Sequence, residues 1–326
     1  MPCELSIVVP VYNEEPENLS RLLEALESTL APLSSTFEVI FVDDGSKLAT
    51  KNACLTLVEK HPHVKLVALS RNYGEQAAIS AGLDHATGQA VINMDSDMQD
   101  PPALIPKMLE YWRQGYDVVL TSQASRKESP FRQFCSFAYY RLLNAFSTVQ
   151  IPVDAGEFRL LSRRAVDVIC AMPEQNKFFR GTVPWIGLRQ IVIPFDRDAR
   201  DLGTSTYTGY KLMKLAMEGL VAFNMRPLYF IPFCGMTLML IALPLQILAI
   251  IASGEIYYRL AFEIAAILFA VSGVQIFCTG LVAIYLAEVL KEVRHRPTYI
   301  VDQLFGFQTA PEHIVAPALA RSPTSV

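Results

Sequence analysis

Two carboxylates stand two residues apart in the segment MDSDMQD at 94–100, at Asp95 and Asp97. The apolar run before them has the composition of a buried strand. Two carboxylates at a strand exit can converge on one hard divalent cation, because Mg²⁺ and Mn²⁺ prefer oxygen ligands and often share a site with substrate phosphates. The motif therefore predicts a metal and phosphate site. The alternative is a solvated acidic turn.

A second acidic pair, Asp43 and Asp44, closes another apolar run. An acidic side chain at such a position can hydrogen-bond ribose hydroxyls or the edge of a base, whereas the alternative is a simple Asp-Gly turn. The chain contains neither GxGxxG nor GxxxxGK[ST]. Dinucleotide-binding and P-loop functions therefore lose their main support.

The elements that would position these residues alternate between strands and helices, which indicates βαβ units and a largely parallel sheet. In such sheets ligands bind at the carboxyl ends of the strands, where the acidic residues fall. Strands are expected at Leu5–Val11, Phe37–Val42, Val64–Leu69, Ala90–Met94 and Tyr116–Thr121. Helices are expected at Pro16–Leu30, up to about Lys60, from about Gly74 to Ala86, and after Pro101 and Pro102.

The composition describes a mixture of a soluble domain and a small membrane part. The 326 residues are 52% hydrophobic and 18% charged, with a formal net charge of −4. These values exclude disorder for most of the chain and a protein of many membrane spans. The acidic balance argues against a nucleic-acid partner. The six cysteines are scattered without a CxxC pair, which excludes a disulfide framework and a cysteine zinc motif.

Two stretches, 228–254 and 264–287, contain no charged side chain and are long enough to cross a bilayer as helices. The alternative is a pair of buried core helices. Basic residues flank the pair on both sides, so the positive-inside rule places the N-terminal domain in the cytoplasm. We expect a multi-pass protein of the inner membrane whose catalytic domain faces the cytoplasm. The flanking basic residues are Lys211, Lys214, Arg226, Lys291, Arg294 and Arg296.

Several segments, in order and spacing, resemble the family 2 glycosyltransferases of the A-type nucleotide-sugar fold. The run from 200 to 207, a basic helix and the two spans are similar to the polyprenyl-phosphate branch, which includes dolichyl-phosphate mannose synthase and the bacterial GtrB-type glucosyltransferases. The resemblance covers about 5–308. The segments are IVVPVYNEE at 7–15, VDDGS at 42–46, SRNYGEQAAISAGLDHATG at 70–88, MDSDMQDPP at 94–102 and DAGEFRLLSRRA at 154–165.

This resemblance implies an α/β fold: a Rossmann-like nucleotide-sugar domain with a mostly parallel central sheet, interfacial helices and a C-terminal two-helix transmembrane hairpin. The expected parts are a glycosyltransferase domain at 1–206, a juxtamembrane amphipathic helix at 207–227, two transmembrane helices within 228–290 (about 228–253 and 263–288), and a cytosolic tail at 291–326 that is disordered from about 309.

The resemblance also assigns roles to single residues. Asp95 and Asp97 would bind Mg²⁺ or Mn²⁺ at the diphosphate, and together with Glu157 they form the expected catalytic set. The residues expected to bind the nucleotide sugar, a UDP-hexose, are Pro10, Tyr12, Asn13, Glu14, Asp43, Asp44, Ser96 and Gln99. Turn and capping roles are the alternative for Pro10, Asn13 and Gln99.

A lipid phosphate acceptor must meet cations near the membrane, and Arg binds phosphate bidentately. Arg126 and Arg132 precede an aromatic-rich stretch at 134–146, Ser136 lies within it, and Arg200 opens the later run. We expect these four residues to bind the lipid phosphate. A helix at about 131–146 would lie at the membrane interface, although a core-facing amphipathic helix with solvated arginines accounts for the same pattern.

The mechanism expected follows from the charge of this acceptor. A phosphate monoester has a second pKa near ~6 and is already a nucleophile at neutral pH, so a strong general base is less necessary. We expect inverting transfer of a hexose, with glucose favoured, from a UDP-sugar to undecaprenyl phosphate. The alternatives are a GDP-mannose-dependent mannose synthase and a non-catalytic membrane scaffold of the same fold. Small residues in the second span, Gly273 and Gly280, favour a homo-oligomer.

The chain departs from the family pattern in three places. Glu157 stands where the family usually has Asp, which moves the carboxylate by about one methylene. Lys47, Leu48 and Ala49 follow VDDGS where an acidic residue is frequent, and Thr206 replaces a frequent Lys.

Overall fold

The computed structural model describes residues 3–33, 36–123, 155–174, 177, 179–195 and 256–307. The chain divides into two compact units. Within the described residues, the first unit contains all the strands and the shorter helices, and the second consists of one long helix, α10 (Ile256–Val293).

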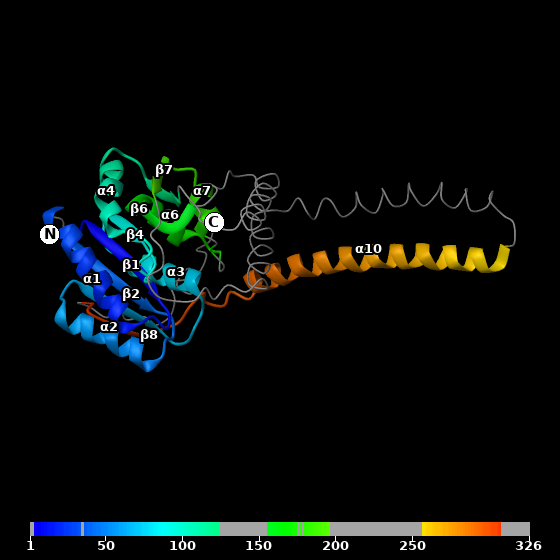
Figure 1. The fold of residues 1–326 in the computed structure, drawn as a ribbon, viewed down its shortest axis with the longest axis horizontal. Coiled ribbons are helices and arrows are strands. Elements are labelled where there is room, and N and C mark those ends of the chain that lie inside the picture. The colour runs from blue at the N-terminus through cyan, green and yellow to red at the C-terminus, as the bar shows by residue number, and fades with distance from the viewer. Residues whose placement is uncertain are drawn as a thin grey trace, which may run out of the picture. The chain divides into compact units, whose positions relative to one another are not determined.

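The strands of the described chain form one mixed sheet in the order β7-β5-β6-β4-β1-β2-β3-β8 (Figure 1). Pairing is parallel between β1 and β2, β1 and β4, β2 and β3, and β5 and β7. It is antiparallel where β6 joins β4 and β5, and where β8 joins β3. The strands are β1 (Leu5–Val11), β2 (Phe37–Asp43), β3 (Val64–Leu69), β4 (Ala90–Asn93), β5 (Val118–Gln123), β6 (Ala155–Ser162), β7 (Gln190–Phe195) and β8 (Val301–Phe305).

Helices cover both faces of this sheet (Figure 1). One core contains buried side chains of α1 (Pro16–Leu30), α2 (Leu48–Lys60) and α4 (Ile105–Arg113). The other contains those of α3 (Glu75–His85), α6 (Arg163–Ala171) and α7 (Phe179–Trp185). Successive residues of β1 divide between the two cores, with Ile7 in the first and Val8 in the second, as the period of two in a strand requires. Two short 3₁₀ helices, η1 (Ala31–Leu33) and η2 (Pro102–Leu104), complete this unit.

Local sequence explains where these helices begin. Pro16 opens α1 in its first turn, where the missing N–H leaves no helical bond unmade. The leucines of α1 recur at helical spacing and form a single buried face against the sheet. Ser162 caps α6, because its hydroxyl oxygen accepts a hydrogen bond from the backbone N–H of Ala165 at 3.2 Å.

The expected α/β architecture with a mostly parallel sheet is confirmed, and β1, β3 and α1 have the bounds that the sequence predicts. β5 begins at Val118, two residues later than expected. The sheet is more mixed than the alternation of strands and helices implies, because β6 enters it antiparallel to both of its neighbours.

The segment after α10 returns to the sheet, which the expected tail at 291–326 did not include. β8 pairs with β3, and the N–H of Ser70 donates to the carbonyl of Ile300 at 3.0 Å. The hydroxyl of Tyr299, a buried residue, donates to Asp84 Oδ2 at 2.6 Å. These contacts fix the chain to the sheet up to Phe305. The disorder expected from about 309 concerns residues outside the described ranges.

The expected membrane hairpin is not confirmed. Its first span, 228–253, and the amphipathic helix at 207–227 lie outside the described residues, and its second span, 263–288, falls within α10. Among the helices of the described residues, none combines the length and the apolar character that crossing a membrane requires. The hairpin therefore stays a prediction.

Candidate active site

The loops that follow β1 and β2 are tied together at the carboxyl end of the sheet. Asn13 adopts a positive φ of 53°, which asparagine tolerates better than most residues. Its N–H donates to Ser46 Oγ at 3.0 Å, and its side-chain oxygen accepts from the N–H of Lys47 at 2.9 Å. Beside it, Tyr12 is 54% exposed and Pro10 is partly buried. This arrangement leaves an exposed aromatic side chain on a fixed loop.

Glu14 follows Asn13 and lies just before α1, which begins at Pro16. Its carboxylate accepts from Asn18 Nδ2 at 2.7 Å, and its backbone carbonyl accepts from the hydroxyl of Thr50 at 2.9 Å. Thr50 belongs to α2, so this contact joins the beginning of α1 to α2. The expected nucleotide-binding residue Glu14 therefore also holds two helices together.

The acidic pair Asp43 and Asp44 is buried rather than solvated. Asp43 Oδ1 accepts from the N–H of Ser46 at 3.0 Å. Asp44 accepts from two successive N–H groups beyond β3, those of Tyr73 at 2.7 Å and Gly74 at 2.8 Å. Burial raises the pKa of Asp44 and outweighs these two bonds, which lower it; the neighbouring Asp43 raises it further. Asp44 thus fixes the backbone from which α3 starts.

The Asp95 and Asp97 motif forms a compact loop after β4. The N–H of Asp95 donates to Asp100 Oδ2, and the N–H of Gln99 donates to Asp97 Oδ1, each at 3.2 Å. Asp95, Asp97 and Gln99 are partly exposed, whereas Ser96 and Asp100 are buried. The loop therefore turns back on the buried Asp100 and holds the two motif carboxylates at its surface.

Glu157 lies on β6, next to β4, and is buried between two guanidinium groups. Its Oε2 pairs with Arg159 and its Oε1 accepts from Arg180 Nε at 2.9 Å. Its backbone carbonyl accepts from Asn93 Nδ2 at 3.0 Å, which ties β6 to the end of β4. The side chain of Arg159 is 2% exposed and that of Arg180 is 35% exposed.

Glu75, the first residue of α3, joins this group electrostatically. Loss of hydration raises the pKa of its carboxyl, Arg180 and Arg159 lower it, and Asp97 and Asp100 raise it again. The net effect is a raised pKa, although Glu75 as a whole residue is exposed. Glu75 therefore belongs to the same charged cluster as the motif after β4.

The buried guanidinium of Arg159 responds to the same groups. Burial lowers its pKa to about 9 and Arg180 adds to that effect, whereas Glu75 and Asp95 oppose it. Carboxylates and guanidinium groups therefore lie together near the carboxyl end of β4. Such an arrangement offers oxygen ligands for a cation and donors for phosphate in one place.

The structure thus gathers the expected catalytic residues Asp95, Asp97 and Glu157 around the end of β4, with the loops after β1 and β2 at neighbouring strand ends. Sequence reasoning missed Glu75, Asp100, Arg159 and Arg180. Glu75, Asp100 and Arg159 lie inside segments that carried the family resemblance. Arg180 lies outside those segments. The expected lipid-phosphate residues Arg126, Arg132, Ser136 and Arg200 lie outside the described residues.

Comparison with known proteins identifies the family. Residues 6–170 match Glycosyl transferase family 2. An uncharacterized glycosyltransferase of Synechocystis sp. is 38% identical and covers 95% of this chain and 98% of its own length. A prophage bactoprenol glucosyl transferase homolog of Escherichia coli is 33% identical and covers 92% of this chain and 99% of its own length. The chain therefore belongs to glycosyl transferase family 2.

Among solved structures, the mannosyltransferase PcManGT from Pyrobaculum calidifontis, in complex with GDP-Man and Mn²⁺, is 19% identical to this chain. The alignment covers 90% of this chain and 89% of that one, with a TM-score of 0.44. A similarity of this size supports no statement about donor or metal.

Proposed function

We propose that the protein transfers a hexose, glucose, from a UDP-sugar to the phosphate of a polyprenyl phosphate, with undecaprenyl phosphate as the acceptor. The observation that carries the proposal is the cluster of Asp95, Asp97 and the arginine-bound Glu157 at the carboxyl end of β4. The choice of sugar and acceptor rests on relatives named bactoprenol glucosyl transferase, which are 34% identical and cover 91–92% of this chain.

A divalent cation, Mg²⁺ or Mn²⁺, fits the residues after β4. Asp95 and Asp97 are hard oxygen donors on one short loop, and both are partly exposed. Two carboxylates suffice for such an ion, because it keeps water ligands and takes substrate phosphate oxygens. When bound, the cation would neutralise charge on the departing nucleoside diphosphate.

The residues of the chain would mainly position the reactants. Loops fixed by Asn13 and Asp44 would receive the nucleotide, with Tyr12 exposed beside them. Asp95 and Asp97 would hold the divalent cation beside the diphosphate. An acceptor phosphate that is already anionic needs little help from a base, so positioning for in-line displacement with inversion would supply most of the acceleration.

Membrane association follows from the same proposal, because a polyprenyl phosphate is dissolved in the bilayer. Large apolar side chains on α10 are exposed, including Ile276 at 72% and Phe277 at 71%. Exposed apolar surface of this kind is typical of protein or membrane contacts. We place the glycosyltransferase unit on the cytoplasmic side, as the basic residues flanking the expected spans indicate.

A donor panel tests the proposal directly. The full chain in undecaprenyl phosphate vesicles would receive radiolabelled UDP-glucose, other UDP-sugars and GDP-mannose, with Mg²⁺ or Mn²⁺. We expect a lipid-linked product from UDP-glucose with inverted anomeric configuration. Product from GDP-mannose alone would show that the donor is GDP-mannose and not UDP-glucose. A product with retained anomeric configuration would reject the single displacement. No lipid-linked product from any donor would reject the transferase function.

The metal assignment makes a separate prediction for Asp97→Asn. Loss of a carboxylate ligand removes several kcal/mol of stabilisation, so we expect kcat to fall by roughly 100-fold or more. Asp167→Asn is the matched control, because Asp167 is 68% exposed on α6 and pairs only with Arg163 among the ion pairs of the described residues. Initial rates at saturating donor would measure both. Equal rates for Asp97→Asn and the unmodified protein would refute the assignment.

A further inference from the structure

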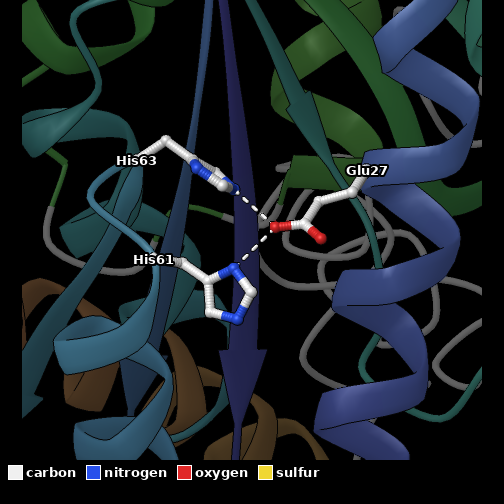
Figure 2. A group of neighbouring side chains, drawn as sticks. All are labelled: Glu27, His61 and His63. Carbon is white, nitrogen blue, oxygen red and sulfur yellow. Dashed lines mark ion pairs between the residues drawn. The ribbon is translucent and has the colours of Figure 1, made fainter.

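Three side chains, one from α1 and two from the connection between α2 and β3, converge near the beginning of β3 (Figure 2). Glu27 belongs to α1, His61 follows α2, and His63 precedes β3. Glu27 Oε1 lies 2.7 Å from His61 Nδ1 and 3.1 Å from His63 Nε2. One ligand atom of each residue lies within 4.8 Å of the other two. We name these three residues the Glu–His–His cluster.

The backbone holds the two imidazoles in place. The N–H of His61 donates to the carbonyl of Leu57 at 3.0 Å, and the carbonyl of His61 accepts from the N–H of Val64 at 2.9 Å. The carbonyl of His63 accepts from the N–H of Val39 at 2.9 Å. The ring of Phe37 meets the ring of His63 edge to face, with centroids 4.8 Å apart. Pro62 between the histidines restricts the chain further.

The cluster is separate from the charged residues around β4. It lies at the amino end of β3, whereas Asp44 contacts the backbone beyond the carboxyl end of the same strand, at Tyr73 and Gly74. A strand of this length, 6 residues, spans roughly 20 Å at ~3.3 Å per residue. An ion bound by the cluster would therefore not be the ion proposed at Asp95 and Asp97.

Glu27 Oε1 pairs with His61 Nδ1 at 2.7 Å, but this contact leaves the third residue of the cluster unsatisfied. His63 Nε2 is shielded from solvent and has no hydrogen-bond partner, although it faces Glu27 Oε1 at 3.1 Å. Buried polar atoms without partners are rare in native proteins because they lose hydration without replacement. Two imidazoles also face the same carboxylate oxygen. Ligation of a cation would satisfy both nitrogens and that oxygen together.

We propose that Glu27, His61 and His63 form a binding site for Zn²⁺. Imidazole nitrogen suits zinc and related transition metals, and two histidines with one glutamate occur as a zinc ligand set. Mg²⁺ and Ca²⁺ favour oxygen ligands throughout and fit this set poorly. The side chains are 28–32% exposed, so water can complete the coordination.

The geometry requires little rearrangement. Zinc bonds of about 2.1 Å in a tetrahedral arrangement place ligand atoms roughly 3.4 Å apart. The oxygen-to-nitrogen distances of 2.7 and 3.1 Å need to open by about 0.7 and about 0.3 Å, within reach of side-chain rotation. Bound zinc would join α1 to the connection between α2 and β3 and would stabilise the folded state, by an amount that grows with the logarithm of the free zinc concentration above the dissociation constant.

Zinc titration of the full chain tests the site. The protein would be purified with its affinity tag removed, stripped with a chelator, and titrated with Zn²⁺ against a chromophoric chelator. We expect one equivalent to bind with an affinity that falls by roughly 100-fold in His61→Ala and in His63→Ala, because each removes a ligand. His85→Ala controls for the loss of a histidine, and a double variant, Asp95→Asn with Asp97→Asn, controls for the proposed catalytic ion. Both controls should keep the affinity.

Unchanged zinc affinity in the two histidine variants, or loss of the equivalent only in the aspartate variant, would overturn the proposal. A second measurement does not depend on variants that fold. Co²⁺ added to the unmodified protein should give the intense visible absorption of a four-coordinate site, displaced by one equivalent of Zn²⁺. Zn²⁺ should also raise Tm of the unmodified protein but not of Glu27→Gln. Absence of both signals from the unmodified protein would refute the site.

Discussion

At the end of β4, one carboxylate holds two guanidinium groups. Glu157 pairs with Arg159, whose side chain is 2% exposed, and with Arg180, whose side chain is 35% exposed. A buried guanidinium is stable only while an opposite charge compensates it, because the hydration it has lost is worth several kcal/mol. Glu157 therefore positions the arginines, whatever further part it takes in the reaction.

Removing the charge of Glu157 should destabilise the protein. In Glu157→Gln the guanidinium of Arg159 would stay buried without its carboxylate, and we expect a loss of about 3 kcal/mol in the free energy of unfolding. Asp167→Asn also takes a carboxylate from an arginine, but the Asp167 side chain is 68% exposed, and we expect a change within about 0.5 kcal/mol. Chemical denaturation would compare the two. Equal losses of unfolding free energy in the two variants would mean that burial does not determine how much the Glu157–Arg159 pair contributes to stability.

Asp95 and Asp97 could be predicted as site residues from the sequence, because they come just after an apolar strand. The basic part could not. Arg159 and Arg180 reach the site through the pairing of β6 with β4 and through the placement of α7, and neither contact has a local signal. Glu75 belongs to the segment that carried the resemblance, but only the fold brings its carboxyl near Asp97. These residues come together only when the chain folds.

Among the elements, the sequence predicts those whose apolar pattern lies within their own residues. It misses those that become part of the fold only by pairing with a strand distant in the sequence. β1 and β3 are short apolar runs that are buried on both faces, and α1 carries a buried face of leucines. β8 has the pattern of an edge strand, with Asp302 and Gln303 exposed, and only its pairing with β3 makes it part of the sheet. A short and largely exposed strand buries too little apolar surface to be recognised alone.

The contact of α3 with the sheet leads to a prediction about one glycine. A Cβ at Gly82 would lie 2.1 Å from Val8 Cγ1 and 3.2 Å from Val42 Cγ2. Valine side chains are stiff, so Gly82→Ala must push α3 away from β1 and β2. We expect a loss of about 1–3 kcal/mol in the free energy of unfolding, seen as a lower Tm.

Gly273 in α10 supplies the matched control, because a Cβ there would meet nothing within 4 Å. Gly273→Ala should leave Tm unchanged or raise it, since alanine favours a helix by about 0.5–1 kcal/mol over glycine. Val8→Ala removes the methyl groups that collide with a Cβ at Gly82. The double variant, Val8→Ala with Gly82→Ala, should therefore lose less stability than the sum of the two single losses. A double variant less stable by the sum of both single effects would show that the collision is not the cause.

At the scale of the whole first unit, acid stability depends on a buried carboxylate between three strands. Glu38 on β2 accepts from Ser6 Oγ on β1 and pairs with Lys65 Nζ on β3, each at 2.5 Å. The same carboxylate accepts from the N–H of Thr87 at 2.8 Å, before β4. Burial acts to raise the pKa of Glu38, but Lys65, Ser6 and Thr87 together outweigh it and lower the pKa.

A carboxyl whose pKa is lower in the folded than in the unfolded state contributes stability above its unfolded pKa and loses that contribution as the pH falls through the folded value. We therefore expect Tm to fall steeply below about pH 4.5, the range in which unfolded glutamate titrates. Glu38→Gln should be less stable at neutral pH and show a shallower acid decline. Glu4→Gln, which alters an exposed pair with Arg113, should keep the original slope. Parallel acid curves for Glu38→Gln and the unmodified protein would mean that other carboxylates govern the acid transition, because a removed group cannot contribute a slope.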